Sequence, residues 1–543
     1  MRRVVREVLR RAPGPAVLLP GALLLAPFWA FPLFPSQDGP SHAANSWILL
    51  SLLTGRHPDL TAAYQLNLEP FPNWFSHASL AGLLTFLEPV TGDKVFLTAC
   101  VLAVVASFRY ALGALRPGSA NLYGLIVPFV SDSALHLGYY NRAFAPVPFL
   151  LALGFWIRRG GRLRARGTAC LAALLLWLYF CAAAALVLAV LGLALLLAAV
   201  TADEHLRAVP DRGRALRHRT VALVAAALPA LGLLARFNAR ESSGVVGPGA
   251  GWRARLRALA TLETVVSLDP REGWLSSALA AVLVVAVVIL IVSRLRKGDW
   301  RFQDGLLVLA CAYLVGYFVA PAVAVAGVGP WGGSTHDRIG PYVWLVLLLW
   351  LGAQPLAKVP GRLLLSATVA IGLGLVGLRL PRYAELNDHL REYLSVAPWI
   401  PPGTTILPLS FAHHGRRDDG QPLSHATWPF RHAASWLVPS RGLVDADNYE
   451  AEVAFFPVTY RGGYDSYRLL GSSLDRMPSC VRIGRFNRLA PRPAEIILVW
   501  GARWAERGDP CTDEIFQVLQ TQYRRVFVSS PRGQAEVYQR LVP

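Results

Sequence analysis

Long apolar runs alternate with short polar connectors along most of the chain, and this alternation predicts membrane-spanning helices. Residues 15–34 form the first run, which has the roughly 20 residues that a helix needs to cross a bilayer. The run at 167–201 is too long for one pass, so we expect two helices with a tight turn near Phe180–Ala183. Further spans are predicted at about 75–90, 95–113, 143–157, 220–236, 275–293, 305–327, 341–354 and 362–380.

One stretch between the predicted spans breaks this pattern. Residues 119–135 include Pro128, Ser131 and Asp132, which make the stretch a poor span. We expect it to be re-entrant or to lie at the membrane interface. With this stretch excluded, the pattern predicts about 11 transmembrane helices.

Composition agrees with a polytopic α-helical membrane protein. The 543 residues are 54% hydrophobic and 16% charged, with a mean hydropathy of +0.40. Soluble domains contain about 25% charged residues, so a soluble class is excluded.

The formal net charge of +19 has its source in arginine-rich connectors. Such clusters are typical of cytoplasmic loops, so we expect a multi-pass protein of the inner (plasma) membrane with a cytoplasmic N-terminus. An odd number of passes places the C-terminus outside. Because no base-stacking or base-reading motif accompanies the arginines, we do not expect nucleic acid as a partner.

The composition changes after about residue 380, which predicts a transmembrane domain at 1–380 and a soluble extracytoplasmic α/β domain at 381–543. Within the second domain, 404–411 and 494–501 have the pattern of buried strands, and 513–541 predicts a helix followed by two strands. Cys480 and Cys511 are the two cysteines of this domain, and an oxidising compartment favours a disulfide between them. The alternative is two unpaired buried thiols.

Ionisable residues gather in the loops that this topology places outside. The first outer loop, 35–74, contains Asp38, His42 and Glu69, and His77 follows it closely. A second long outer loop, 237–274, includes 251–263, whose spaced arginines predict an amphipathic helix on the lipid surface. Ionisable groups at a membrane boundary are costly and are usually functional. We therefore expect a site at the outer face.

Three segments of this chain resemble the GT-C superfamily of membrane glycosyltransferases: SQDGPSHAANSWILLSLL (36–53), GYYNRAFAPVPFLLALGFW (138–156) and STHDRIGPYVWLVLLLW (334–350). The first is similar to the D-x-P-x-H opening of many bacterial members, and the resemblance covers roughly 15–380. It implies transfer of a sugar from a polyprenyl-phosphate donor, with membrane lipid around it, to an outer-face glycan, lipid or protein acceptor.

The resemblance also implies roles for individual residues. A carboxylate at the membrane face would accept the proton of the acceptor hydroxyl, and arginines would bind the leaving phosphate. Members often have two adjacent acidic residues in this loop, whereas Asp38 stands alone, so participation of a divalent cation stays open. The candidate catalytic residues are Asp38, His42 and Glu69, and the candidate substrate-binding residues are Arg338, Asp337, His336 and Arg142.

Each candidate also has an ordinary structural interpretation. Asp38 precedes Pro40 as a helix N-cap residue would, and Glu69 fits a solvated loop. His42 fits an interfacial hydrogen-bonding role, and Arg338 fits a lipid-anchoring side chain. For the whole chain, the alternatives to an enzyme are a lipid or solute transporter and a non-catalytic scaffold for cell-envelope assembly.

Overall fold

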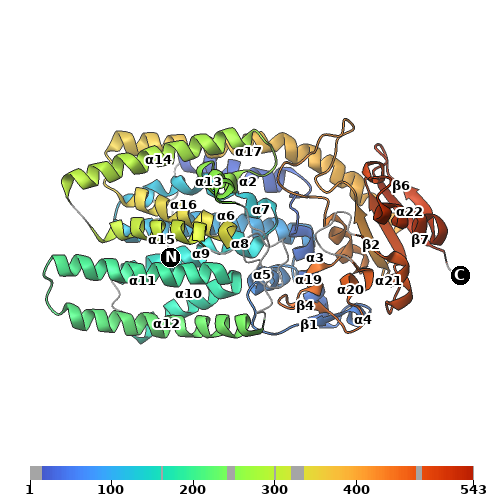
Figure 1. The fold of residues 1–543 in the computed structure, drawn as a ribbon, viewed down its shortest axis with the longest axis horizontal. Helices are drawn as coiled ribbons and strands as arrows, with labels where there is room; N and C mark the ends of the chain where they lie inside the picture. Colours follow the sequence, from blue (N-terminus) through green and yellow to red (C-terminus); the bar gives the residue numbers. More distant parts are fainter. Residues whose placement is uncertain are drawn as a thin grey trace, which may run out of the picture.

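The protein has a bundle of helices at one end and a smaller α/β part at the other (Figure 1). This computed structural model describes residues 15–159, 163–240, 251–298, 301–319, 335–471 and 480–541. We call the end of the bundle that meets the α/β part its outer end. The longer elements of the bundle are α2 (Pro15–Ala30), α6 (Pro89–Leu115), the 3₁₀ segment η1 (Ser119–Phe129), α9 (Pro146–Arg158), α10 (Ala165–Cys181), α11 (Ala183–Leu206), α12 (Arg212–Arg240), α14 (Glu272–Lys297), α15 (Gly305–Val319), α16 (Thr335–Ala353) and α17 (Lys358–Leu394).

The chain is a multi-pass α-helical membrane protein. Among the described residues, six helical segments are long and apolar enough to cross a bilayer. They include α6, α11, α12 and α14, together with the segments that contain α15 and α17. The expected two helices within 167–201 are present, because α10 ends at Cys181 and α11 begins at Ala183. The total of about 11 passes stays a prediction.

Two parts of the predicted topology are wrong. The proposed span at 75–90 is instead α5 (Trp74–Leu83), a helix of only 10 residues that packs on α3 (Gly39–Thr54) near the outer end. Its apolar side chains meet protein, and Pro89 then starts the long helix α6. The hydropathy of α5 resembles that of a membrane span, and only its packing in the fold shows that it is a short helix covered by protein.

The stretch predicted to be re-entrant or interfacial runs through the bundle. Its segment η1 packs against α6, α16 and α17, and Leu125 and Ile126 are buried. The Arg116 side chain before it donates to the backbone oxygen of Gln354, at the end of the bundle far from the α/β part. Beyond it, the His136 oxygen accepts from the Gln37 amide at the outer end. Irregular backbone at this depth is tolerated because protein surrounds it.

The α/β part contains the predicted strands. Its five-stranded sheet has the order β3-β2-β5-β7-β6, with β3, β2 and β5 parallel and β7 antiparallel to β5 and β6. The strands are β2 (Thr405–Ser410), β3 (Val444–Asp445), β5 (Ile496–Trp500), β6 (Tyr523–Val528) and β7 (Ala535–Arg540). The helices around them are α18 (Leu437–Arg441), α19 (Tyr449–Glu452), α20 (Ser466–Leu470), α21 (Ile483–Leu489) and α22 (Pro510–Gln522). Cys480 and Cys511 form the predicted disulfide.

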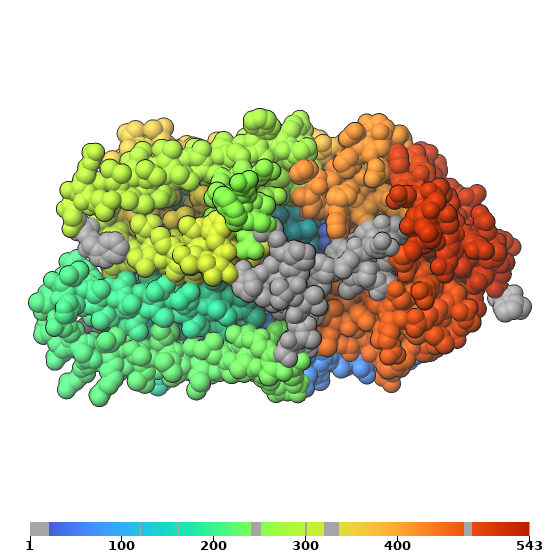
Figure 2. All heavy atoms as spheres, viewed as in Figure 1, coloured from blue at the N-terminus to red at the C-terminus, as the bar shows by residue number. Residues whose placement is uncertain are grey.

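The first outer loop is built into the α/β part. Strand β1 (Tyr64–Leu66) pairs with β4 (Val458–Tyr460), and α3 packs on α18 and on the 3₁₀ turn at 433–436. Helix α17 continues past residue 380 without a break and ends at Leu394, beneath the sheet domain. One hydrophobic core runs from the helices into this junction. Figure 2 shows the C-terminal residues, orange to red, covering that end of the molecule.

The remaining short elements connect the junction to the bundle. They are α4 (Leu60–Ala63), α7 (Ser133–His136), α8 (Tyr140–Phe144) and α13 (Trp252–Ala260). Helix α13 is the predicted amphipathic helix, and none of its residues is buried.

Candidate active site

Asp38 lies at the junction, at the N-cap position of α3. Its side chain makes no capping hydrogen bond, so the interpretation of Asp38 as a simple helix cap is wrong. One carboxylate oxygen accepts from Gln37 Nε2 at 3.0 Å, and the other accepts from the Tyr449 hydroxyl at 3.1 Å. The carboxylate is thus held by a neighbour in sequence and by a residue of the α/β part.

Close backbone packing fixes where Asp38 lies. The loop before α8 approaches so tightly that a Cβ at Gly138 would lie 2.7 Å from the Asp38 nitrogen and 2.4 Å from that of Gly39. Gly138 has a φ of +75°, which glycine adopts without strain. The Asp38 amide also donates to the Leu137 oxygen at 3.2 Å. This loop therefore fixes the Asp38 backbone, whereas Gln37 and Tyr449 hold its carboxylate.

The Asp38 carboxyl is buried, and this changes its acidity. Burial raises its pKa to about 6, although His42, the Gln37 amide, Arg431 and the Tyr449 hydroxyl each lower it. A carboxylate whose pKa lies close to neutral pH both ionises under physiological conditions and accepts a proton readily.

A second carboxylate faces Asp38 across a histidine. His432 Nε2 lies 3.8 Å from Asp38 Oδ1, and His432 Nδ1 lies 3.9 Å from Asp447 Oδ2. Burial lowers the pKa of His432 well below its ordinary value, and Arg431 lowers it further. Burial also raises the pKa of Asp447 to about 6. His432 Nε2 accepts from Arg431 Nε at 3.0 Å, so the neutral imidazole carries its proton on Nδ1, the nitrogen nearer Asp447.

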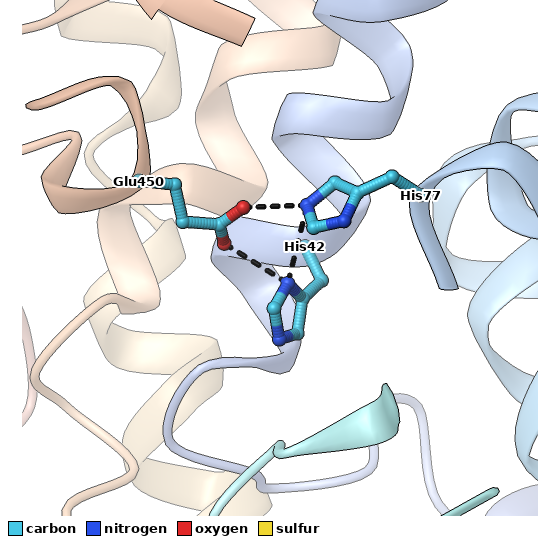
Figure 3. A group of neighbouring side chains, drawn as sticks. All are labelled: His42, His77 and Glu450. Carbon is cyan, nitrogen blue, oxygen red and sulfur yellow. Dashed lines mark hydrogen bonds and ion pairs between the residues drawn. The ribbon is translucent and has the colours of Figure 1, made fainter. Parts of the chain in front are cut away.

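His42 lies in a buried cluster with Glu450 and His77. Its Nδ1 lies 3.0 Å from Glu450 Oε1, and His77 Nε2 lies 2.5 Å from Glu450 Oε2 (Figure 3). Burial opposes the charged form of His42, but the Glu450 carboxylate outweighs it and raises the pKa of His42. Burial likewise opposes ionisation of Glu450, and the two imidazoles hold its pKa well below the ordinary value.

A cavity of about 570 Å³ is bordered by three of the four predicted substrate-binding residues, Arg142, His336 and Asp337, and Arg338 is not among the residues that line it. Its lining includes Gln37, Tyr139, Arg142, His336 and Asp337, together with apolar residues of α13 and α16. Arg142 donates to the Asp337 backbone oxygen at 2.6 Å, so two of the three segments that carry the resemblance meet here. Asp38 lies directly behind this wall, because Gln37 both lines the cavity and donates to Asp38.

Tyr139 connects Asp38 with the predicted arginines. Burial raises the pKa of its hydroxyl, the charge of Asp38 raises it further, and the charges of Arg142, Arg338 and Arg431 lower it. Asp38 and Arg338 therefore both act on one side chain of the cavity wall.

Glu69 is not part of this arrangement. Its carboxylate is 37% exposed and binds Arg236 at 2.6 Å and Arg240 at 2.9 Å, at the end of α12. Within the described residues, no hydrogen bond or ion pair joins it to Asp38. It is an exposed ion-paired residue, in line with the solvated-loop interpretation.

Sequence reasoning missed the residues that the α/β part contributes. They come from two short polar segments, Arg431–His432 and 445–450 (DADNYE). The second has a dense acidic composition for a chain with 16% charged residues, which was the available signal. Nothing in the sequence indicated that they lie next to α3.

Comparisons with known proteins were made over the whole chain. No protein-family model matches it, and no curated protein matches it. Two solved structures of ArnT from Cupriavidus metallidurans align with it at 11% identity. The structure bound to undecaprenyl phosphate has a TM-score of 0.41 and covers 98% of this chain and 99% of that one. The apo structure has a TM-score of 0.38, with 99% and 98% covered. Any assignment of activity to this chain depends on its own residues.

Proposed function

We propose that this protein is a membrane glycosyltransferase that moves a sugar from a polyprenyl-phosphate donor to an acceptor at the outer membrane face. The observation that carries the proposal is the position of Asp38. A buried carboxyl with a pKa of about 6 lies behind the wall of a cavity that holds an arginine and opens between apolar helices and the α/β part. Such a cavity suits a ligand with an apolar tail, an anionic phosphate and a polar sugar.

The proposed reaction has a simple balance of bonds. The acceptor hydroxyl attacks the anomeric carbon, its proton passes to the Asp38 carboxylate, and the carbon–oxygen bond to the phosphate breaks. The polyprenyl phosphate leaves with the electron pair. Arg142, which lines the cavity, is placed to bind the phosphate oxygens.

The proposed orientation follows from the arginine-rich connectors. We infer a plasma-membrane protein with a cytoplasmic N-terminus and with the cavity and the α/β part outside. Polyprenyl-phosphate sugars displayed on that face would reach the cavity from the lipid phase. The acceptor would approach from the side of the α/β part.

The test uses the full chain in lipid nanodiscs. Undecaprenyl phosphate, the lipid present in one of the ArnT structures, is the binding probe, and native mass spectrometry detects the bound lipid. We expect Arg142→Gln to weaken lipid binding by about tenfold or more, the loss of one charge-assisted contact. Arg391→Gln, which changes an exposed arginine near the C-terminal end of α17, is the matched control.

Turnover is then measured as release of polyprenyl phosphate from a panel of polyprenyl-phosphate sugars in the presence of membrane extract as acceptor. Asp38→Asn should bind the lipid as the native chain does and should lose turnover by about 100-fold or more. Undiminished turnover would refute the catalytic role of Asp38. Lipid that crosses liposome membranes without release of sugar would instead favour the transporter, and intact envelope assembly with Asp38→Asn would favour the scaffold.

A further inference from the structure

Three buried donor side chains converge beside the proposed active site from three separate segments. His42 comes from α3, His77 from α5 and Glu450 from α19, and Figure 3 shows all three pointing at one another. His42 Nδ1 and His77 Nε2 lie 3.3 Å apart, and all three ligand atoms lie within 4.8 Å of one another. The His77 and Glu450 side chains have no exposed area, and that of His42 is 6% exposed.

The contacts of His77 determine which of its nitrogens faces the cluster. Its Nδ1 lies 3.3 Å from the Asn73 backbone oxygen, which can only accept. His77 Nε2 faces Glu450 Oε2 at 2.5 Å, so a metal bound at Nε2 would replace that contact and leave the Nδ1 proton to donate to Asn73. Metal-binding histidines are commonly oriented in this way, by donating the other ring proton to a carbonyl oxygen.

The polar contacts of the cluster converge on the Glu450 carboxylate. Glu450 Oε1 is buried and is held by the ion pair with His42 Nδ1 at 3.0 Å. Aromatic rings of Tyr140 and Phe456 border the imidazoles. A cation bound between the two imidazole nitrogens and the carboxylate would compensate the buried negative charge of Glu450.

We propose that His42 Nδ1, His77 Nε2 and the Glu450 carboxylate bind a transition-metal cation, with Zn²⁺ as the first candidate. Two imidazoles and one carboxylate form a donor set typical of zinc and unlike the all-oxygen sets of Mg²⁺ and Ca²⁺. Bonds of about 2.0 Å in tetrahedral geometry place ligand atoms about 3.3 Å apart, the separation seen between the two imidazole nitrogens. This proposal stands on the cluster itself and does not depend on the proposed function.

The position of the site gives the metal a structural role. His42 and His77 belong to the first outer loop and its following helix, whereas Glu450 belongs to the α/β part. The metal would fasten these parts of the chain together one helical turn from Asp38. Tyr449, the neighbour of Glu450, binds the Asp38 carboxylate at 3.1 Å. Metal binding would therefore also position Tyr449 against Asp38.

The experiment measures metal content of the purified full chain by inductively coupled plasma mass spectrometry. We expect about one zinc per chain, and about tenfold less in His77→Ala and in Glu450→Gln. His389→Ala, a buried histidine that binds Gln534 in the α/β part, is the matched control and should keep its zinc. Zinc content equal to that of the native chain in both ligand variants would overturn the proposal.

A second measurement keeps the test valid if a ligand variant fails to fold. The native chain is stripped with a chelator and titrated with Zn²⁺ or Co²⁺ alone. We expect the Tm to fall on stripping and to recover with Zn²⁺, and Co²⁺ to give the absorption of a tetrahedral site. A Tm that responds to neither step, with no Co²⁺ spectrum, would show a metal-free hydrogen-bonded cluster and would refute the site.

Discussion

Replacing Asp38 by Asn should remove turnover and at the same time stabilise the protein. The change keeps the shape of the side chain and an oxygen that accepts from Tyr449, but it removes a negative charge from a buried position. Loss of the base stops proton transfer. Loss of the buried charge removes a cost that the folded state bears whenever Asp38 is ionised.

The size of this cost follows from the acidity of the group. A pKa of about 6 in place of the ordinary 3.8 corresponds to about 3 kcal/mol, at 1.36 kcal/mol for each pH unit. Because the folded-state pKa is raised, the native chain loses this stability as pH rises from about 4 through about 6. Asp38→Asn has no proton to lose there. The variant should therefore be up to about 3 kcal/mol more stable than the native chain at about pH 8, and about equal to it at pH 4.

The assay compares thermal unfolding of the two proteins in detergent across this pH range. The difference between them isolates Asp38, because Asp447 titrates in both. Asp388→Asn, an exposed carboxylate on α17, is the matched control and should show no such trend. A stability gain of Asp38→Asn that does not grow between about pH 4 and pH 8 would refute the assignment of a buried, raised-pKa carboxylate.

Three other predictions use separate features. Turnover of the native chain should fall as pH drops below about 6, because protonated Asp38 cannot act as a base; a rate independent of pH from 5 to 8 would contradict this. Gly138→Ala should lower the free energy of unfolding by about 1–3 kcal/mol and reduce turnover up to about 100-fold, since its Cβ would displace Asp38. Gly377→Ala places its Cβ in open space and should reduce neither stability nor turnover. Measured melting temperatures and rates of both variants test this prediction. Arg379→Met should lower the free energy of unfolding by about 3–5 kcal/mol because it strands buried Glu272, and Glu272→Gln in the same chain should restore part of it; chemical denaturation that shows no loss would contradict the reasoning.

The sequence predicted the elements whose identity depends on local pattern. The strands at 405–410 and 496–500 were predictable because a short apolar run bounded by turn residues is typical of a buried strand. The division of 167–201 into two helices followed from length alone. In contrast, α5 has the hydropathy of a span but packs on α3, and no local signal separates lipid from protein as its neighbour.

The sequence predicted the site residues from the helical bundle and the first outer loop, but it did not predict those from the α/β part. Asp38 and Arg142 stood out because charge at a membrane boundary is rare. The partners of Asp38 and His42 are Tyr449, His432 and Glu450, which lie about 400 residues from Asp38 in the sequence. Side chains of this kind are ordinary in a polar domain. These partners can be recognised only from the three-dimensional structure, which places them next to α3.

The way in which the α/β part docks on α3 explains why these residues act together. Asp38, His42 and Asn45 have the spacing that places side chains on one face of a helix. They meet Tyr449, Glu450 and Asn448, three consecutive residues at the start of α19. The two asparagines exchange hydrogen bonds of 3.0 and 2.8 Å, beside the proposed metal ligands and the proposed base.

Docking, metal binding and the acidity of Asp38 therefore share one interface. A shift of α19 along α3 would remove the Tyr449 hydroxyl from Asp38 and separate Glu450 from both histidines. Without the covering domain, water would reach the carboxylate and its pKa would fall toward the ordinary 3.8. The acidity of Asp38, the proposed base, is thus tuned by a domain that is remote in the sequence, and its proposed reactivity depends on that domain being in place.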